Sequence, residues 1–383
     1  MKPLLRAEQA VLGAVLLDPG QLASLAWLEP GHFYRPTHRA LFAAMRDLHH
    51  AGQPVLVAKG NVPLDWVAGA VAQASRNVHG LSPSYTHTLI AACPRTRHAA
   101  MYGRMVLEGA IHRTITEHAV RLHQAARADA LRGEVDDALH QADVLAGVLS
   151  ELARRWGTQP RPTARPSAET PAPVPAVGER VFQDEQLLLE VLTNQPRAMD
   201  EVIGWLRPAD FADHAHGQLY RCLGALRHRG EPIDEVTVLW EAQRRGLLAD
   251  GTLTPDAVRD LCAGAGAGSA EYLGEQILRS SLTRTAATSA TAIRAAAENE
   301  ALAPGQLISH ALHALCRLDE VRTRWRAATA PPASTTAQSP LSPTARVAAA
   351  QARSRSLQPT SRAPAPATAR TAPATAQSAR HHS

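Results

Sequence analysis

The stretch from Trp27 to Pro54, WLEPGHFYRPTHRALFAAMRDLHHAGQP, decides the fold because a related stretch recurs in the second half of the chain. The stretch from Trp205 to Pro232, WLRPADFADHAHGQLYRCLGALRHRGEP, repeats ten of its residues in the same order and without a gap. The shared residues include a Trp-Leu pair, two prolines, a phenylalanine, two histidines and a glycine. Such an internal repeat indicates two copies of one structural unit.

Both copies have the apolar spacing of helices. In the first copy Pro36 begins a helix, Leu41, Met45 and Leu48 form its apolar face, and Gly52 ends it. The chain is rich in Ala, Leu and Arg and contains only 4% aromatic residues. That composition suits helices better than strands, so we expect an all-α protein.

Each copy ends in the pattern of two long helices that form a hairpin. Apolar residues recur at steps of three and four on both sides of Gly133 in the first copy and of Pro304-Gly305 in the second. We expect these apolar seams to pair the two halves, within one chain or between chains. The seam residues are Leu145, Leu149, Leu152, Trp156, Leu312, Leu315, Val321 and Trp325. The two tryptophans stand beside arginines and suit either the end of a seam or a partner-binding edge.

The composition divides the chain into four parts. Residues 1–156 and 180–326 hold the two helical copies, each a small globular part followed by a hairpin. Residues 157–179 contain six prolines and form a linker, because proline excludes a helix there. Residues 327–383 consist mainly of Ala, Pro, Ser, Thr and Arg without Asp or Glu, and we expect a disordered tail. Its candidate nucleic-acid contacts are Arg346, Arg353, Arg355, Arg362, Arg370 and Arg380.

The repeated residues resemble the N-terminal domain of DnaB-type replicative helicases. The resemblance rests on Glu8-Gln9-x-x-Leu12-Gly13, Phe33-Tyr34-x-x-x-His38 and Gly52-x-Pro54, and in the second copy on Phe211-x-x-x-x-His216 and Gly230-x-Pro232-Ile233-Asp234. It covers about 1–156 and 180–326. The resemblance implies a helical globular part followed by a hairpin through which two copies pair, in a collar that receives primase and loader proteins.

Two departures from the family stand out. The first copy is shorter between Val55 and Tyr85 and has no clear counterpart of the helix expected at 238–246. The motor domain is missing, because a P-loop needs GxxxxGK[ST] and the only lysines are Lys2 and Lys59, neither of which follows a glycine. We therefore expect no enzyme activity and name no catalytic, cofactor-binding or metal-binding residue.

Other candidate sites have simpler interpretations. The Gly264–Gly268 stretch follows no strand and lacks GxGxxG spacing, so we expect an interhelical loop. His214 and His216 beside Asp213 can in principle hold a metal, but one histidine per copy at a helix start favours hydrogen bonding or packing. Core anchors are expected at Trp27 and Trp205. The four cysteines, at 93, 222, 262 and 316, show no ligand or disulfide spacing and are expected to be reduced core thiols.

Charge and hydropathy limit the function classes. The formal charge is +5, carried almost wholly by arginine, which indicates mild attraction to polyanions or simply a GC-rich genome. The sequence has no apolar stretch long enough for a membrane span, so we expect a cytoplasmic protein. The leading hypothesis is a non-enzymatic interaction module of DNA replication that pairs with itself or with a replicative helicase, primase or helicase loader. The alternatives are a DNA-binding accessory protein that uses its arginine-bearing tail, and an accessory subunit of a helicase whose motor is on another chain.

Overall fold

The computed structural model describes residues 3–52, 64–156 and 178–330, and within these ranges the chain is helical and has no strand. The predicted all-α fold is confirmed there. Most of the expected linker and tail, residues 157–177 and 331–383, lies outside the described residues. The last helix continues to Thr329, past the expected boundary at residue 327.

The first half begins with a small group of helices that we call the first head. Its α-helices are α1 (Pro3–Leu17), α2 (Pro36–His50), α3 (Leu64–Ala74) and α4 (Pro83–Ala92). Helix α1 packs against α2 and α4, and α3 packs on α2. The helix that the sequence did not reveal in this copy is therefore present as α3. Its apolar face consists mainly of alanines, and it is anchored by Trp66, whose indole N–H donates to the carbonyl oxygen of Val15 at 3.2 Å.

The second head has the same order of packing. Its α-helices are α7 (Glu179–Asn194), α8 (Met199–Val202), α9 (His214–Arg229), α10 (Glu235–Arg244) and α11 (Pro255–Ala263). Helix α7 packs against α9 and α11, and α10 packs on α9. The glycine-rich stretch is the loop after α11, as expected. A Cβ atom at Gly266 would lie 2.5 Å from the backbone nitrogen of Val191, so this loop passes close to α7 because it lacks side chains.

Two helical hairpins follow the heads. The first consists of α5 (Ala99–Arg132) and α6 (Asp136–Trp156), and the second of α12 (Ala270–Glu298) and α13 (Pro304–Thr329). Between α5 and α6 the chain turns at Gly133, whose φ of +72° is a left-handed conformation that glycine adopts without strain. Ser82 and Ser269 cap the helices that follow them by accepting a hydrogen bond from a backbone N–H three residues on.

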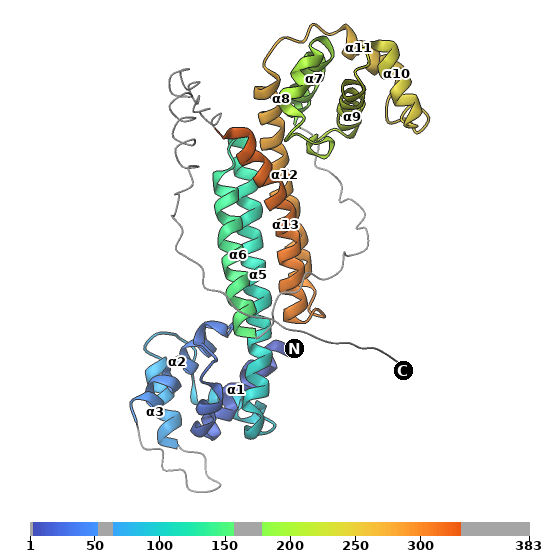
Figure 1. Ribbon diagram of the computed structural model, residues 1–383. Coiled ribbons are helices and arrows are strands. Elements are labelled where there is room, and N and C mark those ends of the chain that lie inside the picture. The colour runs from blue at the N-terminus through green and yellow to red at the C-terminus, as the bar shows by residue number, and fades with distance from the viewer. Residues whose placement is uncertain (1–2, 53–63, 157–177, 331–383) are drawn as a thin grey trace, which may run out of the picture. The chain divides into compact units, whose positions relative to one another are not determined.

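The four hairpin helices pack into one bundle (Figure 1). Helix α5 lies along α12, and α6 lies along α13. By their contacts the residues up to Thr329 form one compact unit, so the two halves share a continuous core. None of the helices in the described residues is long and apolar enough to span a membrane.

The bundle forms because α5 and α12 bury the same kinds of side chain at the same spacing. Small residues alternate with aliphatic ones at steps of three and four, which lets the two long helices approach closely. The buried positions on α5 are Val106, Leu107, Ala110, Ile111, Ile115, Ala119, Leu122 and Ala126. Their counterparts on α12 are Ile277, Leu278, Ser281, Leu282, Ala286, Ala290, Ile293 and Ala297. Burying one Leu or Ile contributes roughly 1.5–3 kcal/mol, so this stripe is a main source of stability.

Candidate interaction site

The predicted seam residues occupy buried or half-buried positions of α6 and α13. Leu145 and Leu149 are fully buried, Leu315 and Val321 nearly so, and Leu152, Trp156, Leu312 and Trp325 are half-buried. The guanidinium of Arg104 on α5 lies over the Trp156 ring at 4.7 Å, and that of Arg279 on α12 lies over the Trp325 ring at 5.4 Å. Each tryptophan thus packs on the first helix of its own hairpin. The largest part of the contact between the halves is made by α5 with α12.

Polar contacts also join the two halves. The ring nitrogens of His112 on α5 lie 2.8 Å from the carbonyl oxygen of Ala297 and 3.1 Å from that of Leu302. On the other pair of helices, Arg322 of α13 donates to both carboxylate oxygens of Asp143 on α6, with one distance of 2.7 Å. The Arg322 guanidinium lowers the pKa of Asp143 below its usual value. These contacts fix the axial position of one hairpin against the other.

In each head a buried glutamate makes hydrogen bonds to the start of one helix. That helix is α2 in the first head and α9 in the second. The carboxylate of Glu8 is fully buried, accepts a hydrogen bond from the backbone N–H of Tyr34 and lies 2.6 Å from the Nδ1 atom of His38. Glu185 does the same in the second head, where it lies 3.0 Å from the Nδ1 atom of His216. The repeated histidine is therefore a buried hydrogen-bonding residue, as the sequence favoured. No group of three or more metal-ligating side chains occurs within the described residues.

The repeated tryptophans are less buried than core anchors. The side chain of Trp27 is 44% exposed, and Trp205 is half-buried. Each ring packs on a glycine in the first helix of its hairpin, because a Cβ atom at Gly103 would lie 3.3 Å from the Trp27 ring and one at Gly274 would lie 2.6 Å from the Trp205 ring. The prediction of core anchors was therefore wrong for Trp27. A glycine at the same position in both long helices was the sequence signal for this contact.

Comparison with known proteins identifies both heads. A family model described as "DnaB-like helicase N terminal domain" matches residues 2–108 and 179–262, one segment in each half. The head of each half therefore matches the N-terminal domain of this family. The matched segments include the heads with their Glu–His pairs and reach into the first hairpin.

The same similarity links the chain to DnaB helicases of several bacteria. It is 34% identical over 139 residues to the replicative DNA helicase DnaB of Mycobacterium leprae (strain TN) and 33% identical over 142 residues to that of Geobacillus stearothermophilus. It is 31% identical over 159 residues to the replicative DNA helicase DnaC of Bacillus subtilis (strain 168). These matches cover 36 to 40% of this chain and 22 to 32% of the helicases. The chain therefore spans less than a third of the length of these relatives.

The two DnaB-like halves differ where the head meets the hairpin. In the second half, the buried carboxylate of Asp210 receives hydrogen bonds from Arg324 of α13, from the Ser281 hydroxyl at 2.9 Å and from the backbone N–H of Arg207 at 2.7 Å. The Asp210 carbonyl oxygen accepts from Arg284 of α12 at 2.6 Å. A buried ion pair with α13 and hydrogen bonds with α12 thus tie the second head to both helices of its hairpin.

In the first half a histidine occupies the corresponding position. The Nδ1 atom of His32 accepts the backbone N–H of Glu29 at 3.0 Å, and its carbonyl oxygen accepts from Arg113 at 3.1 Å. Arg155, the counterpart of Arg324, instead contacts Glu151 at 2.7 Å and Glu29 at 3.2 Å, and all three side chains are more than a third exposed. The first half therefore has the arginines of this junction without the buried carboxylate.

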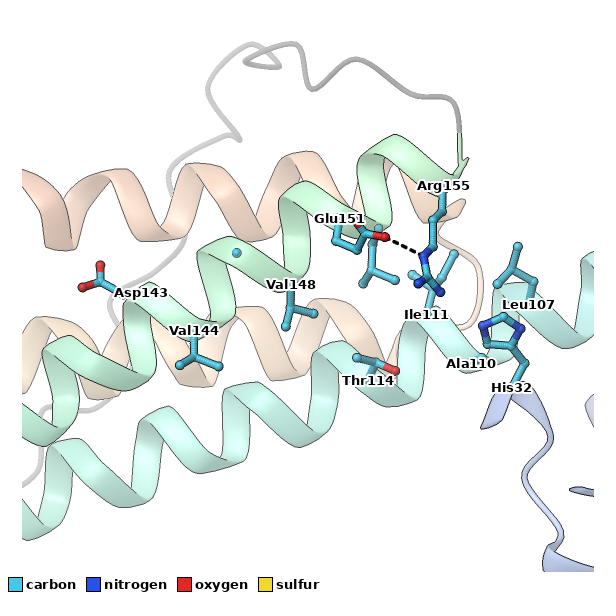
Figure 2. Close-up of a pocket in the computed structure, with 12 residues that line it drawn as sticks. His32, Leu107, Ala110, Ile111, Thr114, Asp143, Val144, Val148, Glu151 and Arg155 are labelled. Carbon is cyan, nitrogen blue, oxygen red and sulfur yellow. Dashed lines mark hydrogen bonds and ion pairs between the residues drawn. The ribbon is translucent and has the colours of Figure 1, made fainter. Parts of the chain in front are cut away.

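A cavity of about 480 Å³ lies beside His32, between α5 and α6 (Figure 2). Apolar side chains form most of its wall, and Arg155 and His32 stand at one end. The lining residues are His32, Leu107, Ala110, Ile111, Thr114, Asp143, Val144, Gly147, Val148, Glu151, Leu152 and Arg155. The sequence did not reveal this cavity, because its residues come from three separated segments.

The cysteines differ in environment more than the sequence predicted. Cys222 is buried, and its burial raises the pKa of the thiol to about 11. Cys93 and Cys262 are half-buried, whereas Cys316 on α13 is exposed. All four are free thiols, but the expectation of core positions was wrong for Cys316.

Proposed function

We propose that this protein is a non-enzymatic interaction protein of DNA replication that presents two DnaB-like heads on a bundle formed by its own two hairpins. The observation that carries the proposal is the packing of α5 and α6 against α12 and α13 within one chain. In the related helicases the corresponding domains belong to longer chains. Here one polypeptide supplies both members of a pair.

Sequence similarity and a missing motif support this function. The relatives are named replicative DNA helicases, and the family model that matches is that of their N-terminal domain. The 383 residues contain no GxxxxGK[ST] motif, so they provide no loop to cradle nucleotide phosphates. The proposed role of the protein is therefore to bind other proteins of the replication machinery and not to unwind DNA.

Pairing within the chain determines which surfaces are free for partners. The apolar faces through which the two hairpins meet are already covered, so a replicative helicase, primase or loader would bind to the heads or to the outer faces of the hairpins. A tether raises the effective concentration of one half near the other toward the millimolar range. Pairing between the halves is therefore expected to persist at low protein concentration.

Isotope-mixed cross-linking tests the intramolecular pair. Equal amounts of ¹⁴N- and ¹⁵N-labelled protein are mixed, incubated and treated with a carboxylate-reactive cross-linker, because the chain has only two lysines. We expect links between residues 134–156 and 305–325 in which both peptides carry the same isotope. Links of mixed isotope would show pairing between chains, and the absence of links between these ranges would overturn the pairing.

Partner binding tests the replication role. The purified chain is immobilised and exposed in turn to the replicative helicase, its N-terminal domain and the primase of the same cell, and its ATPase rate is measured with and without single-stranded DNA. We expect saturable binding of the helicase or the primase and no ATPase activity that co-purifies with the chain. Binding of neither protein would overturn the proposal.

The six tail arginines without acidic neighbours favour a second candidate function, binding of DNA by an accessory protein. That function predicts DNA affinity that falls steeply with salt and does not depend on helicase or primase. A helicase whose ATPase rate changes when the chain binds would instead favour an accessory subunit of that enzyme.

A further inference from the structure

We propose that the cavity between α5 and α6 docks an amphipathic helix of a replication partner, with aliphatic side chains along the groove and a carboxylate next to His32 and Arg155. The inference rests on the proposed function, because it assigns to an interaction protein the surface on which one partner sits. The partner helix has an apolar face with an acidic side chain at one end.

The second half shows which group the first half lacks. Around Asp210, one carboxylate joins Arg324 to the head and is buried almost completely. In the first half the equivalent backbone hydrogen bonds are kept, but His32 replaces the carboxylate. The position next to Arg155 therefore suits a carboxylate that comes from another molecule.

His32 and Arg155 both offer hydrogen-bond donors at this end of the cavity. Burial lowers the pKa of His32, the nearby Arg155 and Arg113 act in the same direction, and Glu29 opposes them. The ring is therefore neutral at pH 7, and because its Nδ1 atom accepts the N–H of Glu29, its Nε2 atom carries the proton. A carboxylate placed here accepts from Nε2 and from the guanidinium at once.

Arg155 can change partners at small cost. Its present contacts are with Glu151 and Glu29, whose side chains are 39% and 53% exposed. Ion pairs in such exposed positions contribute little because water screens them. A hydrogen bond between charged groups that a docked helix shields from water is stronger. Glu151 would keep its contact with Arg154.

The rest of the groove suits aliphatic side chains. On α6, Val144, Val148 and Leu152 follow one another at steps of four, and they line the cavity together with Leu107 and Ile111 of α5. Figure 2 shows Val144 and Val148 on α6 along this groove. The volume lies in the range of binding pockets, and a helix that docks in a groove inserts apolar side chains spaced at i, i+4 and i+7 along its own sequence. The bundle itself leaves the groove free, because its lining comes only from α5, α6 and the turn at His32.

The second half has different residues at the positions that line this groove. Aligning Trp156 with Trp325 places His313, Cys316 and Arg317 of α13 where α6 has Val144, Gly147 and Val148. Polar and charged residues at these positions do not form an apolar groove. A basic helix would gain nothing from the first groove, because Asp143 is held by Arg322 and Glu151 by two arginines.

A peptide titration tests the proposal on the full chain. The probes are three stapled helical peptides with leucines at positions i, i+4 and i+7 that differ only at one end, which carries Glu, Gln or Lys. Methyl-labelled protein reports the site through Leu107, Ile111, Val144 and Val148. We expect the Glu peptide to bind about tenfold more tightly than the Gln peptide and to shift these methyl signals. Equal affinities for the three peptides, or shifts confined to other methyl groups, would overturn it.

Two variants make the test specific, and a third is the control. Val148→Arg introduces the side chain that the second half has at that position and is expected to abolish binding. His32→Asp supplies the missing carboxylate within the chain and is expected to remove the preference for the Glu peptide. Arg317→Val changes the matching position of α13 and leaves binding unchanged.

Circular dichroism checks that each variant is folded. If Val148→Arg does not fold, His32→Asp still tests whether the groove prefers the Glu peptide. The helicase and primase assays are then repeated with a folded groove variant. If a partner binds the wild type and the variant equally, the groove proposal fails while the replication role stands. If the variant loses both the Glu peptide and that partner, the groove is the docking site.

Discussion

At the scale of single residues, two glycines inside helices differ in how much free space surrounds them, and this difference gives a prediction. A Cβ atom at Gly13 in α1 would lie 2.2 Å from the carbonyl oxygen of Leu89 in α4, whereas one at Gly147 in α6 would meet nothing within 4 Å. Gly13→Ala is therefore expected to destabilise the protein by about 1–3 kcal/mol through overpacking. Gly147→Ala is expected to stabilise it by about 0.5–1 kcal/mol, because alanine loses less backbone entropy in a helix. Urea unfolding of both variants measures the two effects, and equal changes would contradict the close packing of α1 on α4.

The ion pair between Asp143 and Arg322 predicts a pH dependence. Because the pKa of Asp143 is lowered in the folded chain, the pair stabilises the fold above the ordinary aspartate pKa of about 3.9. That stabilisation is lost as the pH falls through the lowered value. Asp143 is 56% exposed, so we expect Asp143→Asn to cost only about 0.2–1 kcal/mol at pH 7, and this cost is expected to shrink as the pH falls through the lowered pKa.

Thermal unfolding between pH 2 and 7 measures this difference. The control is Asp319→Asn, because Asp319 lies 3.9 Å from the same arginine and its contact is weaker. A penalty for Asp143→Asn that stays constant down to pH 2 would mean that the effect comes from packing and not from charge.

At the scale of elements, the corner between α12 and α13 depends on a side chain from the other half. His112 of α5 contacts the carbonyl oxygens of Ala297 and Leu302, which lie at the end of α12 and just before α13. His112→Ala removes these contacts and is expected to speed amide hydrogen exchange in residues 297–303 at least several-fold, while the heads keep their protection.

The control for this prediction is His123→Ala, because His123 lies on the same helix and reaches the Ala287 carbonyl oxygen only at 3.4 Å. Equal exchange at the α12–α13 corner in wild type and His112→Ala would show that the corner is held by its own hairpin alone.

The elements also show where sequence patterns were ambiguous. Helix α13 has two overlapping apolar faces, and the sequence seam followed the one with Leu312, which is half-buried. The face that packs most tightly contains Leu307, Ala311 and Leu318, each at most 1% exposed. Periodicity alone does not choose between such faces, because the choice depends on what packs against the helix.

At the scale of the whole molecule, removal of residues 331–383 separates folding from nucleic-acid binding. The compact unit ends at Thr329, so we expect the truncated chain to keep its cooperative melting transition and its helicity per residue of the compact unit. DNA affinity is expected to fall, and its dependence on salt to become weaker, because six arginines are lost.

Circular dichroism and fluorescence anisotropy at several salt concentrations measure both properties. The control replaces only the six arginines by glutamine in the full chain, which is expected to have the same effect on DNA. Loss of the melting transition on truncation would mean that the removed residues contribute to the core.

The sequence by itself determined the helical fold, the repeated unit, the DnaB-like resemblance and the missing P-loop motif. These are local properties, since helix spacing and caps depend on residues a few positions apart. The tertiary structure decided that α5 pairs mainly with α12, that Trp27 stays half exposed and that a cavity opens beside His32. Such features depend on side chains far apart in the chain, as Arg324 and Asp210 are, and replacing one buried carboxylate by a histidine leaves no periodic trace in the sequence.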